Sequence, residues 1–398
     1  MTKLDPASRW FPLLLVGLMM AGAVSIDIYL PSLPDMARLF QTDAARVQLT
    51  LSVFFAGFAV AQLVLGPLSD RFGRRPVFVG GILLYLVATV ACLVASQINT
   101  LILARFFQAL GACAGPVLSR AIVRDVYPPD QASRVFATLA SIFAVTPALA
   151  PIVGGNLHAA FGWRANFIVM LGFGVLQLAA VRYLLPETNR HLNMRALDPL
   201  RILFNYRLLL RSRHFLGYTL MMGFTFSAMF TFISGSPLIL IGLLGVRPEY
   251  YGLWVLLVTA GFLTGSLSVA RLASRFGSER MVRIGAAIAL AAGLVMAGLA
   301  WAGIETVMTV IGPAIFLFLA AAMVLPCSTA LAIAPYARIA GTASALLGFL
   351  QMSLAACAGW LAAYLHDGTT IPVAGVILAV LAASACVHRV LLAGRNVP

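Results

Sequence analysis

Two long apolar runs are joined by Gly66-Pro67-Leu68-Ser69-Asp70-Arg71-Phe72-Gly73-Arg74-Arg75-Pro76. Glycines permit a tight turn because they lack a β-carbon. Arginines keep such a turn on the cytoplasmic side of a bilayer, and Asp70 can accept a charge-assisted hydrogen bond or face a helix N-terminus. The stretch therefore predicts a structured turn between two membrane-spanning helices, although an ordinary basic loop is the alternative. The residues expected to shape this turn are Gly66, Asp70, Arg71, Gly73, Arg74 and Arg75.

The composition places the whole chain in a membrane. Of its 398 residues 61% are apolar and 10% are charged, and the mean hydropathy is +0.97. Such a chain has too little polar surface to cover a soluble globule of this size. The formal net charge of +14 comes from arginines in short links between apolar runs, a pattern that sets membrane topology and does not indicate nucleic-acid binding. The five cysteines lie in apolar segments without paired spacing, which predicts packing residues and not disulfides or metal ligands.

Twelve apolar runs are long enough to cross a bilayer as helices. They fall at about 11–36, 45–69, 76–97, 99–123, 132–157, 163–185, 214–241, 249–274, 281–302, 306–334, 339–365 and 371–393. The largest polar interruption lies between Pro186 and His214 and separates six runs from six. We therefore expect an all-α membrane protein with a six-helix bundle at 1–190, a cytoplasmic linker at 191–213 and a second six-helix bundle at 214–398.

A short internal repeat supports two related halves. Leu68-Ser69-Asp70-Arg71-Phe72-Gly73 follows the second run and Leu272-Ala273-Ser274-Arg275-Phe276-Gly277 follows the eighth, with Ser274 where the acid would be. Equivalent positions in the two halves favour duplication over chance. Basic residues concentrate on the side that carries both termini, which predicts cytoplasmic termini.

Asp27 is the one charge in the first apolar run between Phe11 and Pro34. An ionised side chain in hydrocarbon costs about 2.5 kcal/mol or more, so it normally faces a bundle interior or a wet cavity and finds a partner. Arg105 in the fourth run is the expected partner, because a rise of about 1.5 Å per residue places both at a similar depth. The alternative is that Arg105 snorkels to the outer interface and only anchors its helix. We expect Asp27 to switch between protonated and ionised forms as its access to solvent changes.

Three stretches resemble signatures of the major facilitator superfamily. Residues 66–76 resemble the signature between the second and third spans, and residues 103–111 resemble the fourth-span motif, whose arginine is associated with proton coupling. Residues 147–155 resemble the fifth-span motif typical of antiporters. Its prolines kink the helix and its small residues let a neighbouring helix approach, which is also what packing alone would require. We expect this motif to seal the inward route and favour export; its residues are Pro147, Pro151, Gly154 and Gly155.

Residues 25–34, 224–232 and 340–344 are similar to the bicyclomycin and chloramphenicol resistance subfamily of drug:proton antiporters. The resemblance covers all twelve runs. It implies a twelve-span facilitator bundle that exports small amphipathic drugs in exchange for protons, with the proton gradient as energy source and no cofactor. The sequence departs from the pattern of this subfamily in two ways. Ser274 replaces the second acid of the repeat, and no second membrane carboxylate accompanies Asp27.

A pliable apolar cavity with few polar anchors suits varied drugs. The candidates for its lining, besides Asp27 and Arg105, are Tyr29, Gln62, Gln108, Phe230, Phe232, Ser236, Gln351 and Met352. For the aromatic and methionine residues the alternative is packing or lipid contact. We also expect Asp70, Arg71, Arg75 and Arg124 to latch an outward-open state, with Arg120 and Asp125 at the inner end of the fourth run as further partners of the turn. The five histidines lie at or beyond the ends of the runs and are expected to be solvated.

The sequence contains no phosphate-binding loop, nucleophile with a nearby base or metal-ligand cluster, so it does not predict an enzyme. The expected partners are a small drug, protons and the lipid bilayer. Each half needs the other to enclose a cavity, so we expect a functional monomer. Two other classes stay open: a transporter of a metabolite such as an amino acid or a sugar, and a membrane sensor or scaffold that transports nothing.

Overall fold

The computed structural model describes residues 3–5, 8, 10–128, 135, 146–189, 192–194 and 196–392. Within these residues all regular structure is helical, and eleven helical stretches are long and apolar enough to cross a membrane. The predicted all-α membrane fold is confirmed. The fifth predicted run lies largely outside the described residues, and its described part is α9 (Thr146–Phe161). Pro151 lies inside α9, whereas the side chain of Pro147 is outside the description.

The first half of the chain contains α1 to α10. Its elements are α1 (Phe11–Met19), α2 (Ala21–Asp27), η1 (Leu30–Ser32), α3 (Leu33–Leu39), α4 (Ala44–Phe72), α5 (Arg74–Leu93), α6 (Ile98–Ala112), α7 (Ala114–Val126), α9 and α10 (Arg164–Tyr183). The first predicted run is divided into short helices, and Pro31 and Pro34 contribute to this because proline donates no backbone hydrogen bond. A Cβ on Gly115 would overlap the Leu18 carbonyl, so α7 and α1 cross in close contact.

The second half follows a connecting helix, α11 (Pro199–Arg211). Its elements are α12 (Arg213–Pro237), η2 (Leu238–Leu243), α13 (Pro248–Phe276), α14 (Ser278–Trp301), α15 (Val307–Ile333), η3 (Ala334–Ile339), α16 (Ala340–Tyr364), α17 (Ile371–Val387) and η4 (His388–Leu392). These helices cover the seventh to twelfth predicted runs.

The sequence repeat is also a structural repeat. Helices α4 and α13 both span 29 residues, and both end at a glycine with positive φ, 98° at Gly73 and 78° at Gly277. The next helix starts directly after each glycine. This combination of positive φ and extended ψ is nearly restricted to glycine, so the glycine of each repeat is what permits so tight a turn.

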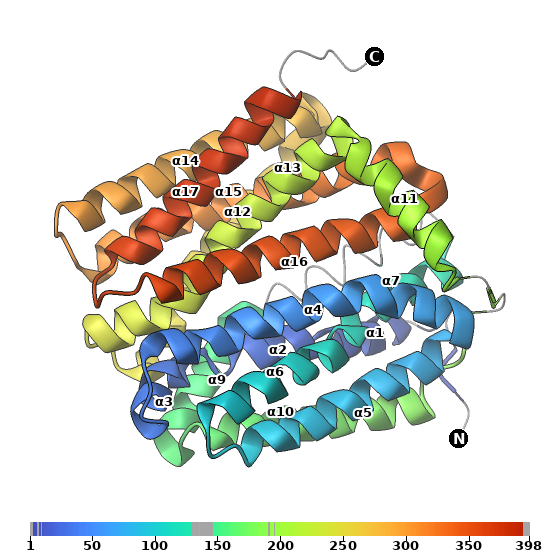
Figure 1. Cartoon of the computed structure of the whole chain (residues 1–398), viewed down its shortest axis with the longest axis horizontal. Helices are drawn as coiled ribbons and strands as arrows, with labels where there is room; N and C mark the ends of the chain where they lie inside the picture. The colour runs from blue at the N-terminus through green and yellow to red at the C-terminus, as the bar shows by residue number, and fades with distance from the viewer. Residues whose placement is uncertain are drawn as a thin grey trace.

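The two halves lie side by side with their long helices roughly aligned (Figure 1). Helix α4 packs against α16, and α9 packs against α13, across the boundary between the halves. We call one end of the molecule the linker face: it carries α11, the α4–α5 turn at Gly73 and residues 184–189, 192–194 and 196–198. Leu4 donates a backbone hydrogen bond to Leu184 at 2.9 Å, and Leu392 lies against Gly217. Both ends of the described chain therefore lie at the linker face.

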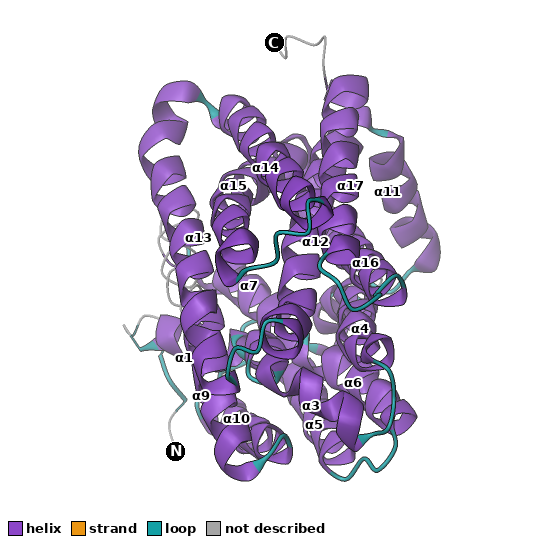
Figure 2. Ribbon diagram, turned by 90° about the vertical axis from the view of Figure 1, so that its left-hand side faces the viewer, coloured by secondary structure: helices purple, strands orange, loops and turns teal. Residues whose placement is uncertain are grey.

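The predicted linker contains an amphipathic helix. The Asp198 side chain caps α11 by accepting the Leu200 N–H at 3.0 Å. Leu209 is buried, whereas Leu200 and Phe204 are 78% and 68% exposed. Helix α11 packs on α12 and α16 and lies at the edge of the molecule beside α16 (Figure 2). Its buried side therefore faces the second half, and its exposed apolar residues lie on another side.

Candidate functional site

Asp27, the carboxylate singled out in the first run, is the last residue of α2 and is only 6% exposed. Its side chain has no recorded ion pair within the described ranges. The hydroxyl of Tyr251 on α13 lies within electrostatic range of it and is hydrogen-bonded to Ser236 Oγ at 2.9 Å. Asp27 lies near the boundary between the halves, because η1, which follows it in the chain, packs against α13 of the second half.

Arg105 on α6 is fully buried, so it does not snorkel to an interface. Its NH1 donates to Gln108 Oε1 at 2.6 Å, and Gln108 Nε2 donates to Thr89 Oγ1 at 2.8 Å. The guanidinium carbon lies 4.7 Å from the ring centre of Tyr29 and 4.4 Å from that of Phe54. Its Nε and NH2 have no hydrogen-bond partner among the described residues. Two aromatic rings and one amide, and not a carboxylate, surround this cation.

The predicted ion pair between Asp27 and Arg105 is absent from this structure. Arg105 lies over Tyr29, two positions after Asp27 in the chain. Residues two apart on a helix do not share a face. The turn that brings Tyr29 to Arg105 therefore directs Asp27 away from the arginine. Equal depth in the bilayer, on which the prediction depended, fixes a position along the helix axis and not a direction around it.

Gly154 and Gly155 lie where α9 touches both halves. A Cβ on Gly154 would overlap the carbonyl of Ile28, and a Cβ on Gly155 would overlap the carbonyl of Pro248 at the start of α13. The small residues of the fifth-span motif thus allow the close helix approach that was predicted for them. They bring α9 against the residue that follows Asp27 and against the helix that carries Tyr251.

Arg74 is the central residue of the α4–α5 turn. Its NH1 lies 2.5 Å from Asp70 Oδ1, and its Nε lies 2.9 Å from Asp125 Oδ2 on α7. Glu187 accepts the backbone N–H groups of Arg74 and Arg75 at 2.9 and 3.0 Å. A carboxylate in this position satisfies free amides at the start of α5 and interacts favourably with the helix dipole. Two aspartates that bind the Arg74 side chain and one glutamate that binds the backbone N–H groups therefore hold the turn in place.

Asp70 accepts a charge-assisted hydrogen bond, as predicted, but its donor is Arg74. The other residues of the predicted latch make local contacts: Arg71 lies over the Phe72 ring, Arg75 donates to the Arg182 carbonyl at 2.6 Å, and Arg124 donates to the Arg120 carbonyl at 3.5 Å. The ion pairs recorded in the described residues on the linker face all lie within the first half. The latch expected for the outward-open state stays a prediction.

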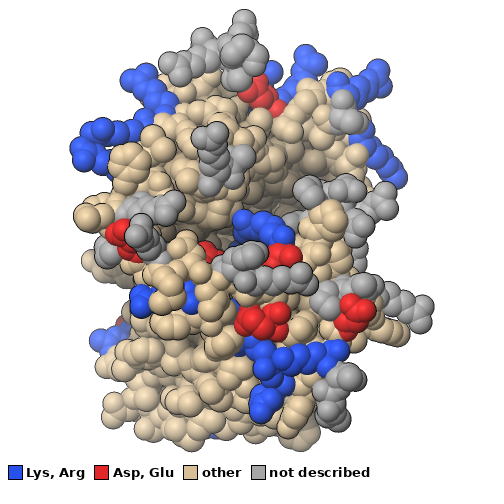
Figure 3. All heavy atoms as spheres, turned by 90° about the vertical axis from the view of Figure 1, so that its right-hand side faces the viewer, with Lys and Arg blue, Asp and Glu red and all other residues tan. Residues whose placement is uncertain are grey.

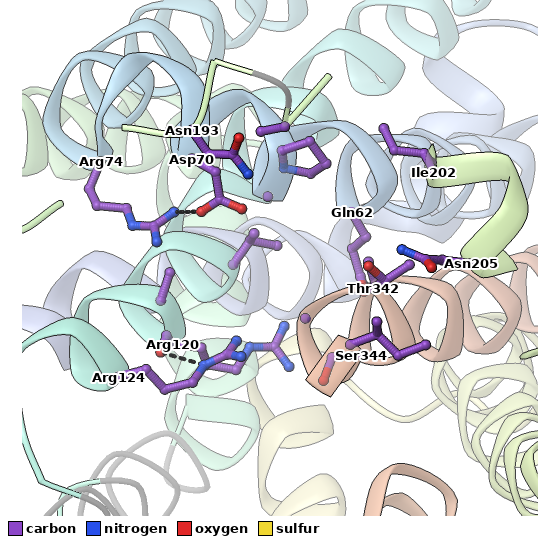
Figure 4. A pocket seen from close by; sticks show the side chains of 18 of the residues that line it. Gln62, Asp70, Arg74, Arg120, Arg124, Asn193, Ile202, Asn205, Thr342 and Ser344 are labelled. Carbon is purple, nitrogen blue, oxygen red and sulfur yellow. Dashed lines mark hydrogen bonds and ion pairs between the residues drawn. The ribbon is translucent and has the colours of Figure 1, made fainter. Parts of the chain in front are cut away.

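A cavity of about 420 Å³ opens at the linker face between the two halves. Figure 3 looks onto this end of the molecule and shows a hollow with basic side chains at its edge. Figure 4 shows the lining at close range. The polar and charged side chains that line it include Gln62, Asp70, Arg74, Arg120, Arg124 and Asp125 of the first half, Asn205 and Tyr206 of α11, and Thr342 and Ser344 of α16; Gly66 also lies in the wall.

At the end opposite the linker face the halves are in contact. Gln48 Nε2 on α4 donates to Ser234 Oγ on α12 at 3.0 Å. Further along the same helices the rings of Phe55 and Phe230 lie 3.9 Å apart between centres. The two halves are thus separated by a cavity at the linker face and joined by uncharged contacts toward the opposite end.

Of the predicted cavity residues, Gln62 lines the linker-face cavity, where it also lies against Gly348 of α16. The others have partners elsewhere: Tyr29 is hydrogen-bonded to Thr50, Gln108 to Arg105, and Ser236 to Tyr251, while Phe230 packs on Phe55 and Phe232 meets Phe318 edge-on. Gln351 and Met352 are half-buried on α16. Helical position showed that these side chains face inward, but it could not distinguish a cavity wall from a packed contact.

His158 was predicted to be solvated, and this is wrong. It is 8% exposed, and its Nε2 lies 2.7 Å from Asp35 Oδ2 of α3. The reason is that α9 packs against α2 and η1, which brings His158 at the end of α9 against Asp35 of α3. Tyr251, Glu187 and this histidine pair were missed by sequence reasoning, because their partners are distant in the chain.

Apolar spanning helices in two halves, a cavity open at one end and buried ionisable groups between helices define a membrane transporter. Residues 13–360 match the family model of the Major Facilitator Superfamily. The chain belongs to this family, and the predictions of a transporter and not an enzyme are confirmed.

Relatives with curated names are similar over most of their length. A bicyclomycin resistance protein homolog of Haemophilus influenzae is 31% identical over 373 residues, which cover 92% of this chain and 93% of the relative. Multidrug resistance protein D of Escherichia coli is 32% identical, over 85% of this chain and 84% of the relative. A chloramphenicol resistance protein of Pseudomonas aeruginosa is 29% identical, over 82% of this chain and 77% of the relative.

Solved structures support the same fold. A bacterial homolog of the human lysosomal transporter Spinster, in an inward-facing and occupied conformation, superposes with a TM-score of 0.76 and covers 99% of both chains at 16% identity. At this identity the likeness establishes the fold alone.

Proposed function

We propose that this chain exports small drugs of the phenicol or bicyclomycin type in exchange for protons. The observation that carries the proposal is the buried carboxylate of Asp27 at the boundary between the halves, with no basic partner in the described part of the chain. Ionisable groups at such depth commonly lie on ion or proton pathways. The names of the relatives, bicyclomycin, multidrug and chloramphenicol resistance proteins, favour a drug as the exchanged substrate.

In this proposal the linker face lies on the cytoplasmic side of a bacterial inner membrane. Arginines crowd this face, among them Arg71, Arg74, Arg75 and Arg124, and basic residues of short loops remain on the cytoplasmic side. The cavity of about 420 Å³ is then open to the cytoplasm, the side from which an exporter loads. One chain encloses the cavity, so the working unit is a monomer.

Proton exchange follows from the position of Asp27. In this structure Asp27 is buried, and α13, the helix that carries Tyr251, packs against η1 just after it in the chain. When the halves rock and the opposite end opens, Tyr251 moves away and periplasmic water reaches the carboxylate. Protonation there releases the drug outward, and loss of the proton toward the cytoplasm restores the form that binds drug. Arg105 acts as a positioning residue, because its contact with the Tyr29 ring fixes the direction of the turn that bears Asp27.

The test is uptake and release of a labelled phenicol by the purified protein in liposomes, with and without an imposed proton gradient. Asp27→Asn keeps the shape of the side chain and removes its titration, so gradient-driven flux should be lost. Asp367→Asn changes a carboxylate in the loop before α17 and serves as the matched control. Flux in that control should equal wild type. If Asp27→Asn exchanged drug for protons at the normal stoichiometry, the coupling scheme would be wrong.

A further inference from the structure

The acids and arginines of the linker-face cavity are unequally paired. Arg74 binds both lining aspartates, Asp70 and Asp125, at 2.5 and 2.9 Å. Arg120 and Arg124 line the same cavity and have no recorded ion pair within the described ranges. Their recorded hydrogen bonds go to backbone carbonyls of α7 itself, at 2.9 and 3.5 Å. Three arginines and two aspartates thus give the cavity a net charge of +1, and neither Arg120 nor Arg124 forms an ion pair with a described residue.

These two arginines are also arranged to act together. They are four residues apart on α7, so they share one face of the helix. Figure 4 shows both side chains extending into the cavity toward α16. Neighbouring like charges on a helix repel each other, and an anion placed between them would remove that repulsion. Guanidinium groups suit such a ligand because their planar N–H groups match the oxygens of carboxylates and phosphates.

The opposite wall offers hydrogen-bond donors and no negative charge. Thr342 and Ser344 of α16 line it with hydroxyl groups, and Asn205 of α11 adds a carboxamide. No side chain caps the first turn of α16, so its backbone amides add to the positive potential of this wall. No acidic side chain from α11 or α16 is among the residues that line the cavity.

We propose that Arg120 and Arg124, with Thr342 and Ser344, form a binding site for a compact oxyanion, a phosphate or a phosphate ester. The site lies in the linker-face cavity and contacts both halves. The anion comes either from a soluble phosphate or from the headgroup of an acidic phospholipid, which present the same chemistry. The inference does not depend on the identity of the transported drug or on Asp27.

The test measures binding of inorganic phosphate to the purified full-length chain by isothermal titration calorimetry, with chloride at equal ionic strength as the reference. Arg120→Gln with Arg124→Gln should weaken binding at least tenfold. Arg275→Gln with Arg280→Gln removes the same charge from the linker face outside the cavity and should leave the affinity unchanged. Should the first pair fail to fold, Thr342→Ala with Ser344→Ala tests the other wall and should weaken binding several-fold.

Two lipid environments separate the sources of the anion. If phosphate binds with equal affinity in nanodiscs of phosphatidylcholine and phosphatidylglycerol, the site takes a soluble anion. If phosphatidylglycerol abolishes phosphate binding, and the Arg120 and Arg124 substitutions reduce the phosphatidylglycerol retained by the protein, the site takes a headgroup. The proposal is overturned if wild type binds neither probe, or if the cavity substitutions leave binding of both unchanged.

Discussion

Replacing Gly154 with alanine tests whether α9 packs on the first span as closely as the structure indicates. The added Cβ would overlap the carbonyl oxygen of Ile28 and would lie 2.6 Å from its carbonyl carbon and 3.0 Å from its Cα. Non-bonded carbon atoms ordinarily lie about 3.5–4.0 Å apart, so α9 must retreat by about 1 Å. These are backbone atoms, and no change of rotamer relieves the contact.

Overpacking of this kind costs about 1–3 kcal/mol, and alanine recovers at most about 1 kcal/mol through its helix propensity. We therefore expect Gly154→Ala to lower the free energy of unfolding by about 1–2 kcal/mol. Drug flux should fall as well, because the displaced residue Ile28 adjoins Asp27.

Gly172→Ala in α10 is the matched control, since nothing lies within 4 Å of its added Cβ. This variant should be neutral or stabilised. Thermal unfolding in detergent and phenicol flux in liposomes measure both effects. The reasoning is refuted if Gly154→Ala unfolds and transports like Gly172→Ala.

Three further predictions concern charges and backbone. Arg74→Gln leaves Asp125 without its cation and should lower the free energy of unfolding by about 1.5–3 kcal/mol, measured by thermal unfolding; an unchanged transition would contradict the role of this ion pair. Gly73→Ala forces a positive φ of 98° on alanine at a cost of about 1–3 kcal/mol, whereas Gly66→Ala, with open space around its Cβ, should cost far less in the same assay. Arg105→Lys keeps the charge but loses the planar stacking on two rings and the guanidinium geometry that bonds Gln108, so phenicol flux should fall about tenfold or more; wild-type flux would argue against a positioning role.

The spanning helices and the turn at Gly73 could be predicted because their signals are local. The length of an apolar run determines whether it can cross a bilayer as a helix, and a glycine between two such runs marks a tight turn. Gly73 and Gly277 occupy equivalent positions in the sequence repeat, and they also share a backbone conformation, with φ of 98° and 78°. Neither inference needed knowledge of which helices are neighbours.

Which side chains meet could not be predicted in the same way. Depth placed Asp27 and Arg105 at one level, but only the packed structure shows that they point to different neighbours. Asp125 was expected near the turn, but its pairing with Arg74, 51 residues away, was not. Glu187 reaches Arg74 from 113 residues away, and no spacing in the sequence marks it. The arginines of the turn are chemically alike, so the geometry of the folded turn decides which of them binds the acids.

The distribution of charged and neutral contacts has a consequence for switching between states. Arg74 binds Asp70 and Asp125 within the first half, so the linker face can open without breaking either ion pair. The recorded contacts that join the halves at the other end are neutral, and the Gln48–Ser234 hydrogen bond is of a kind worth about 0.5–1.5 kcal/mol net. A transporter must exchange its open and closed ends at a small free-energy cost. An arrangement that keeps its ion pairs inside one half and separates the halves at neutral contacts meets this requirement.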